Sequence, residues 1–405
     1  MSNRAVLVAK LGVVLLLMFG YSFFATAFAA VGTIESFPQP ASNVASIPTA
    51  VPNPPDFDAK SYILMDANSG YVIAEKNPDL RVSPASITKV MSLYLIAKAL
   101  RSGQIHLNDQ VTVSENAWRT GGSRMFIRVG TNVVVEDLIK GMVVASGNDA
   151  TVAMAEHIAG TEQAFANLMN QEARNLKMNN TNYIDGNGLH DDNYSTAFDL
   201  ANLARAWTVN FPEYYPWFKE KWMVYNNIRQ PNRNRLLWRD ASVDGIKTGH
   251  TQEAGYCLIA SAIRNGMRLI TVVMGAKNDN ARANNSMALL SYGFRFFESY
   301  KVFAANAAIS TPKVWFGKEK KAALGLPEGL YVTLPVGQYK NVKANAVIKS
   351  HLKAPIVKGS SYGVINIVLD GKVIASKPLV ALQDNPRANF ICIAFDYIKM
   401  LFSKQ

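Results

Sequence analysis

Two pairs of short apolar runs in the chain predict β-hairpins. Residues 62–65 and 71–74 are separated by a polar turn that ends in glycine. Residues 255–263 and 267–274 meet at Asn265-Gly266, a dipeptide that strongly favours a two-residue hairpin turn. We therefore expect these runs to form antiparallel strands of a sheet.

Longer stretches with helical periodicity precede and follow these strands. From Val90 to Leu100, apolar residues occupy so many faces of the expected helix that it must be buried. Ser83 and Pro84 are typical of its N-cap and first residue, so Ser86 is expected in its first turn. Further helices are expected at residues 135–144, 150–159 (with Asp149 as its cap) and 286–297. Together these elements predict an α/β fold, a sandwich of helices on an antiparallel sheet, over residues 58–300.

The pattern changes after residue 300. Residues 301–383 contain short strand-like runs and an Asp370-Gly371 hairpin signal, which predict a small all-β domain. Residues 384–405 return to helical spacing. Their apolar residues are Phe390, Ile391, Ala394, Phe395, Ile398, Leu401 and Phe402, opposite Arg387, Asp396, Lys399 and Lys404. This segment is too short and too polar to span a bilayer, so we expect an amphipathic helix lying on a membrane surface, with docking on its own protein as the alternative.

The N-terminal residues carry a targeting pattern. Arg4 and Lys10 precede the apolar run 11–28, which ends on the small residues around Ala29 and Ala30. Residues 1–30 are therefore predicted to be a cleaved signal peptide, with an uncleaved membrane anchor as the alternative. Residues 31–57 are expected to be an extended linker, because six prolines lie between Phe37 and Phe57.

Composition and charge limit the classes of molecule that the chain can be expected to bind. The 405 residues carry a formal charge of +12, which falls to +10 without Arg4 and Lys10, and this surplus suits anionic lipid. Export and the lack of a basic helix interleaved with aromatics argue against nucleic acid. Cys257 and Cys392 are too few for a disulfide framework, and no metal site or cofactor is predicted. Four of the six tryptophans, at 207, 217, 222 and 238, are expected in the core or in the walls of a cleft.

Three short motifs carry the candidate chemistry. They are Ser86-Ile87-Thr88-Lys89, Ser146-Gly147-Asn148 and Lys247-Thr248-Gly249. Each is weak alone, but in this order they are typical of serine enzymes that attack D-alanyl peptides and β-lactams. A serine hydroxyl needs a base to become a nucleophile, and residues three apart on a helix share a face. Lys89 can serve as this base if it is neutral, and we expect burial and the second cation Lys247 to lower its pKa.

The other two motifs offer binding groups. The Ser146 hydroxyl can relay a proton, and the Asn148 amide can hold the peptide group of a substrate. Lys247 and Thr248 offer a cation and a hydroxyl to a free carboxylate. The backbone N–H groups of Ser86 and His250 are expected to form an oxyanion hole. The strand that carries Lys247 can pair with an extended substrate.

The chain resembles the D-alanyl-D-alanine carboxypeptidases of the low-molecular-weight penicillin-binding protein group, which have a small β-domain and a C-terminal membrane helix. Besides the three motifs, the resemblance rests on the run Val243 to Thr251 and on several shorter segments. These are Pro84-Ala85-Ser86, Ser123 to Phe126, Ser146 to Ala150, Asn187-Gly188-Leu189, Ile228-Arg229-Gln230, Asn232-Arg233-Asn234 and Gly293 to Phe297.

The resemblance implies a role for each motif residue. Ser86 would be acylated, Lys89 would accept its proton and Ser146 would assist. Lys247 and Thr248 would bind the terminal carboxylate, with Arg282 near it. Asn187 stands where some relatives carry histidine, so a role of that histidine in deacylation does not carry over.

These observations favour a periplasmic serine carboxypeptidase that removes the terminal D-alanine from peptidoglycan stem pentapeptides. We expect β-lactams to acylate and inhibit it, and the C-terminal helix to attach it to the outer face of the inner membrane. One alternative is a β-lactamase, but no obvious Glu-x-x-x-Asn follows Asn148. The other is a non-catalytic scaffold for wall shape, which the intact motifs argue against.

Overall fold

The computed structural model describes residues 30–34 and 50–402. The expected signal peptide, except Ala30, and residues 35–49 of the expected linker lie outside these residues. The chain forms two compact units. The helix–sheet unit takes the described residues within Ala41–Lys301 together with Tyr331–Lys340. The β-rich unit takes those within Met1–Pro40, Val302–Leu330 and Asn341–Gln405, so the chain passes between the units more than once.

A five-stranded antiparallel sheet forms the centre of the helix–sheet unit. Its strand order is β3-β2-β10-β9-β8. The bounds are Ser61–Asp66 for β2, Val72–Lys76 for β3, Val243–Thr251 for β8, Gly255–Arg264 for β9 and Met267–Ala276 for β10. Both predicted hairpins are confirmed. Asn265 and Gly266 have φ of 49° and 78°, as a tight hairpin turn requires.

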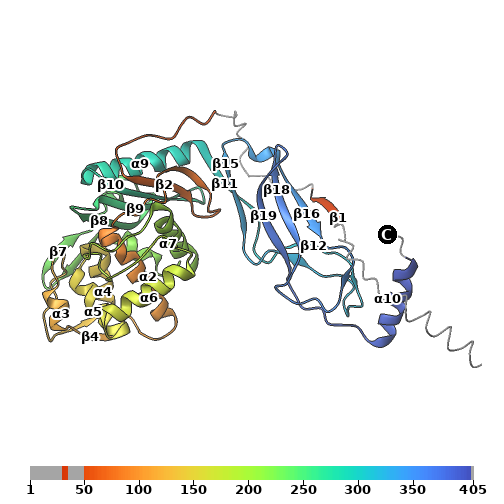
Figure 1. The fold of residues 1–405 in the computed structure, drawn as a ribbon, viewed down its shortest axis with the longest axis horizontal. Helices are drawn as coiled ribbons and strands as arrows, with labels where there is room; N and C mark the ends of the chain where they lie inside the picture. The colour runs from red at the N-terminus through yellow and green to blue at the C-terminus, as the bar shows by residue number, and fades with distance from the viewer. Residues whose placement is uncertain (1–29, 35–49, 403–405) are drawn as a thin grey trace, which may run out of the picture. The chain divides into compact units, whose positions relative to one another are not determined.

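Helices cover both faces of this sheet (Figure 1). The side chains of β2 alternate between two cores, so Leu64 packs with α9, Asp279–Phe296, while Ile63 packs with the helices on the opposite face. Those helices are α2, Lys89–Arg101; α5, Asn148–Ala159; α6, Glu162–Asn175; and α7, Ala197–Asn210. The predicted sandwich of helices on an antiparallel sheet is therefore confirmed.

Several short elements complete the helix–sheet unit. They are β4 (Gln110–Thr112), α3 (Glu115–Arg119), β5 (Asn132–Val134), α4 (Val135–Lys140), η2 (Gly141–Ala145), η3 (Tyr215–Lys219), β6 (Trp222–Tyr225), β7 (Ile228–Pro231) and α8 (Leu236–Arg239).

The predicted start of the first helix is wrong. Residues Ala85–Thr88 form a 3₁₀ turn, η1, and α2 begins only at Lys89. Ser83 caps neither element, since Pro84 is the N-cap of η1 and Thr88 is that of α2, and neither makes a side-chain capping hydrogen bond. The physical reason is the backbone of Ala85, whose φ of 47° is left-handed and cannot belong to an α-helix.

Three other helix predictions also need correction. α9 begins seven residues before the predicted Ser286, because the Asn278 side chain accepts from the Ala281 N–H and caps it there. Residues 135–144 divide into α4 and the π-helical turn η2. Asp149 is not a cap; it lies in the first turn of α5 and binds another loop.

The β-rich unit contains a six-stranded sheet of order β1-β16-β18-β19-β14-β12. The bounds are β1 Ala30–Ile34, β12 Ala308–Ser310, β14 Leu324–Gly325, β16 Val342–Ile348, β18 Ser361–Leu369 and β19 Lys372–Ala381. Its smaller strands are β13 (Val314–Trp315) and β17 (Leu352–Lys353), which pair with each other. β11 (Phe297–Phe303) pairs with β15 (Leu330–Pro335), and most residues of these two strands and of η4 (Tyr339–Asn341) belong to the helix–sheet unit.

The first residues of the expected linker are instead a strand. β1 pairs antiparallel with β16 at the sheet edge, from Ala30 opposite Ile348 to Ile34 opposite Ala344. This is compatible with the sequence, since Val31, Thr33 and Ile34 favour strands and the prolines begin only at Pro38.

The C-terminal helix α10, Phe390–Phe402, forms as predicted, but one of its residues faces a different side than expected. Asp396 was expected on its solvent side, but its side chain is buried in the β-rich unit. It accepts hydrogen bonds from the Phe316 N–H at 2.9 Å and from Lys320 Nζ at 3.0 Å. No helix within residues 50–402 has the length and apolar character needed to cross a bilayer.

Candidate active site

The structure brings the three sequence motifs together in the helix–sheet unit. Lys89 Nζ lies 3.2 Å from Ser86 Oγ and 2.6 Å from Asn148 Oδ1, which joins the first motif to the second. Lys247 Nζ lies 2.9 Å from Ser146 Oγ, which joins the second to the third. The motifs come from η1 and the start of α2, from the η2–α5 junction, and from the edge strand β8.

Lys89 is completely buried and its amine has three oxygen neighbours. Besides Ser86 Oγ and Asn148 Oδ1, the Asn187 carbonyl oxygen lies 2.7 Å from Nζ. A neutral amine has two N–H donors and one lone pair. Donation to Asn148 and Asn187 therefore leaves the lone pair for the Ser86 hydroxyl.

Burial lowers the pKa of Lys89 to about 7, so the neutral form is well populated at neutral pH. Asp185 and Asp149 oppose this shift, while the charge of Arg233 adds to it. Arg233 is thus a cation that lowers the Lys89 pKa, and Lys247 interacts with Lys89 as well, since the charge of Lys89 lowers the pKa of Lys247. Lys247 is itself buried, and its own pKa is lowered.

The position of Ser86 depends on two glycines that let other chain segments approach η1. A Cβ on Gly249 of β8 would lie 2.7 Å from the Pro84 carbonyl oxygen. A Cβ on Gly188 would lie 1.9 Å from the Ala85 carbonyl oxygen, and Gly188 has a φ of 81°. In a 3₁₀ turn residues three apart eclipse one another, which points Ser86 Oγ toward Lys89.

Ser146 ends the π-helical turn η2 in a left-handed conformation, with φ of 59° and ψ of 34°. A non-glycine residue there is strained, and such strain is common at functional sites. The turn directs the buried hydroxyl at Lys247 Nζ, which also donates to the Thr248 carbonyl at 3.1 Å.

Lys247 differs from the simple cation that the sequence suggested. Burial, Lys89, Arg233 and Arg282 together hold its pKa well below the usual value. Several basic side chains thus lie around the site, and among the described residues Lys247 has no carboxylate ion-pair partner. An anionic ligand is the natural complement of such a site.

Both the nitrogen and the oxygen of the Asn148 side-chain amide form hydrogen bonds. Its Nδ2 donates to the Gly121 carbonyl at 2.8 Å, while its Oδ1 receives Lys89 Nζ. One N–H and one lone pair of the amide remain for a substrate. The next residue, Asp149, is buried and accepts backbone N–H groups of Met125, Phe126 and Ile127, which holds this loop beside Asn148.

Sequence reasoning missed the loop that follows Asp185. The Asp185 carboxylate accepts from the N–H groups of Asn187, Gly188 and His190, and this fixes the Asn187 carbonyl above Lys89. Asn187-Gly188-Leu189 was noticed only as part of the resemblance. The glycine between two turn-forming residues was the available signal, but a backbone carbonyl has no sequence signature.

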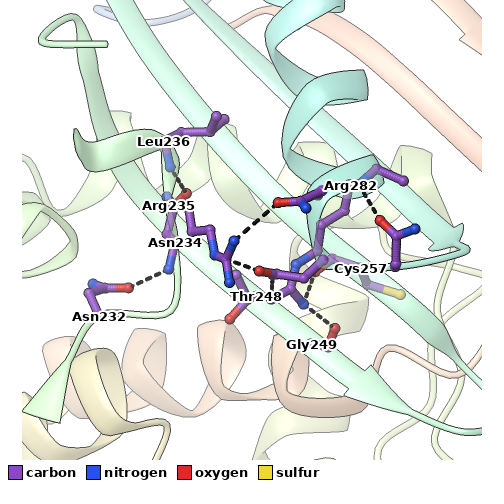
Figure 2. A network of polar contacts seen from close by, with 12 residues as sticks. Asn232, Asn234, Arg235, Leu236, Thr248, Gly249, Cys257 and Arg282 are labelled. Atoms are coloured by element: carbon purple, nitrogen blue, oxygen red, sulfur yellow. Dashed lines mark hydrogen bonds and ion pairs between the residues drawn. The ribbon is translucent and has the colours of Figure 1, made fainter. Parts of the chain in front are cut away.

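The remaining predicted residues lie along β8. Thr248 is buried and His250 is exposed, with its ring 4.0 Å from that of Tyr256. Arg282, at the start of α9, is buried and donates to the Gly249 carbonyl at 2.9 Å and to Asp279 (Figure 2). Arg282 thus supports β8 from behind the site. Arg233, a residue without a predicted role, lowers the pKa of both Lys89 and Lys247 through its charge.

Comparison with known proteins decides among the interpretations. A family model described as D-alanyl-D-alanine carboxypeptidase matches residues 48–278, more than half of the chain. The chain belongs to this family. A second model, described as the penicillin-binding protein 5 C-terminal domain, matches residues 297–387. The β-lactamase and scaffold alternatives are not favoured, and serine carboxypeptidase activity through an acyl-enzyme is the function that the family implies.

Individual relatives agree over most of their length. The chain is 44% identical to D-alanyl-D-alanine carboxypeptidase DacA of Escherichia coli, covering 88% of this chain and 91% of the relative. It is 42% identical to DacC of the same organism, covering 95% and 94%. The crystal structure of penicillin-binding protein 5 from Haemophilus influenzae has a TM-score of 0.78 at 42% identity, covering 83% of this chain and 99% of that chain.

Proposed function

We propose that Ser86 Oγ attacks the carbonyl carbon of the penultimate D-alanine of a stem pentapeptide and releases the terminal D-alanine. The observation that carries this proposal is the buried Lys89 amine, 3.2 Å from Ser86 Oγ and with a pKa of about 7. A general base works best when its pKa lies near the working pH. Lys89 meets this condition because burial disfavours its ammonium form.

The acylation step can be written with its proton. The bond between Ser86 Oγ and the substrate carbonyl carbon forms while the hydroxyl proton moves to Lys89 Nζ. The peptide C–N bond then breaks, and the departing amine takes up a proton. Ser146 assists this transfer, with its hydroxyl held 2.9 Å from Lys247 Nζ. Water subsequently hydrolyses the acyl ester.

We propose that the N–H groups of Ser86 and His250 bind the oxyanion of the tetrahedral intermediate. Gly249, between His250 and Thr248, supports this assignment. Its missing Cβ lets β8 approach η1 closely enough for the two N–H groups to face one reacting carbonyl. β8 is also an edge strand of the five-stranded sheet, so an extended peptide can add to it as a further strand.

We assign the terminal carboxylate to Lys247 and Thr248, with Arg282 and Arg233 contributing positive potential. A carboxylate next to Lys247 favours its ammonium form and so raises the pKa that burial and the neighbouring cations lower. Asn148 supplies its remaining N–H to the peptide group of the substrate. These contacts would select a peptide with a free C-terminus.

Penicillin-binding proteins bind stem peptides and β-lactams. The relative from Listeria monocytogenes, penicillin-binding protein D2, was solved in an ampicillin-bound form and has a TM-score of 0.54 at 27% identity. We propose that β-lactams acylate this chain at Ser86, because the strained ring carbonyl occupies the place of the scissile peptide. The adduct is long-lived if water attacks it slowly.

One experiment tests this function. The purified chain is incubated with a pentapeptide ending in D-Ala-D-Ala, and free D-alanine is measured. Release by the wild type and its loss in Ser86→Ala are expected. The matched control is Ser83→Ala, a neighbouring buried serine outside the motifs, which should keep activity. Unchanged release by Ser86→Ala would refute the assignment.

The family is one of periplasmic cell-wall enzymes. We further propose that residues 1–30 direct export, that residues 58–300 and 301–383 are the catalytic and β-domains, and that residues 384–405 attach the chain to the outer face of the cytoplasmic membrane. α10 supports this attachment, because Phe390, Phe395 and Ile398 are at least half exposed while Asp396 is buried. Its apolar side is thus available to lipid.

Truncation tests the attachment. A chain that ends at residue 384 should lose binding to vesicles that contain anionic lipid while keeping its D-alanine release. Membrane binding by the truncated chain would show that the anchor lies elsewhere.

A further inference from the structure

Two exposed tryptophans form an edge-to-face pair on the surface of the helix–sheet unit. Trp222 on β6 and Trp238 at α8 are 44% and 43% exposed, and their ring centroids lie 5.8 Å apart at an interplanar angle of 81°. By contrast, Trp207 is completely buried. Two large aromatic side chains held together in water indicate a binding surface more strongly than scattered exposed residues do.

Buried polar groups fix the two tryptophans in place. Asn234, which is 1% exposed, donates from Nδ2 to the Gly245 carbonyl of β8 at 2.9 Å. Its Oδ1 accepts from the Leu236 N–H, and its own N–H donates to Asn232 Oδ1 (Figure 2). Asn232 Nδ2 in turn donates to the Glu220 carbonyl at 2.8 Å. The segment between Trp222 and Trp238 is therefore anchored to the strand that carries Lys247, and the ring pair is preorganised.

Two cations lie over these rings. Arg229 Cζ is 4.2 Å from the Trp222 ring centroid, and Lys221 Nζ is 6.0 Å from that of Trp238. Within the described part of the chain, neither forms an ion pair. We call Lys221, Trp222, Arg229 and Trp238 the tryptophan platform. It offers aromatic faces together with N–H donors whose positive charge is not neutralised by a carboxylate partner.

The platform adjoins the candidate active site. β6 and β7 pack against η2, the turn that leads to Ser146. Gln230 Nε2 of β7 donates to the Arg124 carbonyl at 3.3 Å, in the loop that Asp149 holds beside Asn148. Through Asn234 the platform is also joined to β8. The segment that carries the platform therefore contacts the elements that carry Ser146 and Lys247.

We propose that the tryptophan platform binds the amino-sugar glycan strand that carries the stem peptide. The faces of sugar rings present C–H groups that pack on aromatic rings, and their hydroxyl and acetamido oxygens accept hydrogen bonds from Arg229 and Lys221. The peptide carboxylates of the polymer are anionic and complement the two cations. This inference rests on the proposed function, because it assumes that the stem peptide is processed at Ser86.

The chemistry of the surface favours a glycan over a bilayer. Val224 is exposed on the same face of the hairpin, but Arg229 lies directly opposite it in the register and covers Trp222. A cation laid over the ring leaves a mixed polar and aromatic surface. Lipid insertion would instead need a continuous apolar patch.

The test compares two substrates that share one stem pentapeptide. One is the free peptide, and the other is the same peptide attached to a soluble glycan oligomer. The variants are Trp222→Ala, Trp238→Ala and the double variant, with Tyr71→Ala as a control for loss of an exposed aromatic residue elsewhere. Acylation by a labelled penicillin reports whether each variant is folded.

For the glycan-linked substrate, we expect KM to rise about fivefold in each single variant and about tenfold or more in the double variant, with kcat unchanged. The free peptide should react at the wild-type rate with every variant. Trp222→Phe should keep most of the affinity for the glycan-linked substrate, and Arg229→Gln should raise its KM about threefold.

The possible outcomes distinguish the proposed carboxypeptidase function from glycan binding by the tryptophan platform. No D-alanine release from either substrate by the wild type would remove the proposed function itself. Equal effects on both substrates, or none on either, would overturn the platform while leaving the function intact. Reduced vesicle binding by the double variant, with unchanged KM for the glycan-linked substrate, would assign the surface to lipid and also overturn the proposal.

Discussion

The main-chain carbonyl oxygen of Asn187 lies 2.7 Å from Lys89 Nζ. Together with Asn148 Oδ1 at 2.6 Å, it occupies the two N–H donors that a neutral amine has. The lone pair of the amine then faces Ser86 Oγ. An ammonium group would fill all three contacts with protons and could not accept one. The arrangement therefore acts as a base only in the protonation state that burial favours.

The Asn187 carbonyl depends on the close contact of Gly188 with η1. Gly188→Ala would place a Cβ 1.9 Å from the Ala85 carbonyl at a φ of 81°. We expect a loss of about 2 kcal/mol or more in the free energy of unfolding, and penicillin acylation at least about tenfold slower. Gly103→Ala is the matched control, because Gly103 has a similar φ of 74° but nothing within 4 Å. If both variants acylate equally fast, the contact does not position the site.

Asp149 is predicted to position Asn148. In Asp149→Asn, the amide loses one acceptor oxygen and turns donors toward N–H groups of residues 125–127. We expect about 3 kcal/mol lower stability by urea denaturation and a clearly slower acylation rate. Glu115→Gln removes only an exposed ion pair with Arg119 and should cost less than about 1 kcal/mol. An Asp149→Asn variant with the stability of the wild type would contradict this role.

Binding of a carboxylate should make Lys247 take up a proton. Its pKa in the empty site is well below the usual value, and the ligand charge raises it, so the amine goes from neutral to charged when binding occurs above the lowered pKa. Calorimetry of Ser86→Ala with acyl-D-Ala-D-Ala, in buffers of different ionisation enthalpy, measures this uptake. The C-terminal amide of the same peptide is the control and should give none. Equal proton uptake by the two peptides would rule out Lys247 as the carboxylate ligand.

The exposed side of α10 is predicted to bind lipid. Phe395 is 60% exposed, and Phe395→Asp places a charge where we expect the membrane surface. Binding to anionic vesicles should weaken about tenfold or more, because the variant loses an aromatic ring that would enter the lipid and gains a charge there. Val209→Asp, at a site 58% exposed on α7, is the control and should bind normally. Sedimentation with vesicles distinguishes the two, and similar losses in both variants would argue against α10.

Sequence periodicity predicted the sheet, both of its hairpins and the helical layers, because burial repeats every two or every 3.6 residues. It failed where the backbone departs from regular geometry. Ala85 with its positive φ, the π-helical turn before Ser146 and the left-handed Ser146 itself have no pattern of their own. These departures lie at the candidate site, where strain is retained for function.

The candidate site was predictable only in part for the same reason. Ser86, Lys89 and Lys247 belong to motifs whose side chains perform the chemistry. The Asn187 carbonyl and the loop held by Asp149 act through the backbone and through contacts far apart in the sequence. Asp396 is a second example. Its charge predicted a solvent-exposed side chain, but Lys320 and the Phe316 N–H, far away in the sequence, hydrogen-bond to it inside the protein.

The pH dependence of acylation tests the central claim most directly. The second-order rate constant for a labelled penicillin is measured from about pH 5 to 9, with attachment mapped to Ser86. The account predicts a rate that rises as Lys89 loses its proton, with a midpoint near the pKa of about 7, and then levels off. Lys89→Arg, which stays charged, should abolish acylation. A rate that does not change over this range, or that rises only near the ordinary pKa of lysine, would contradict a neutral Lys89 as the base.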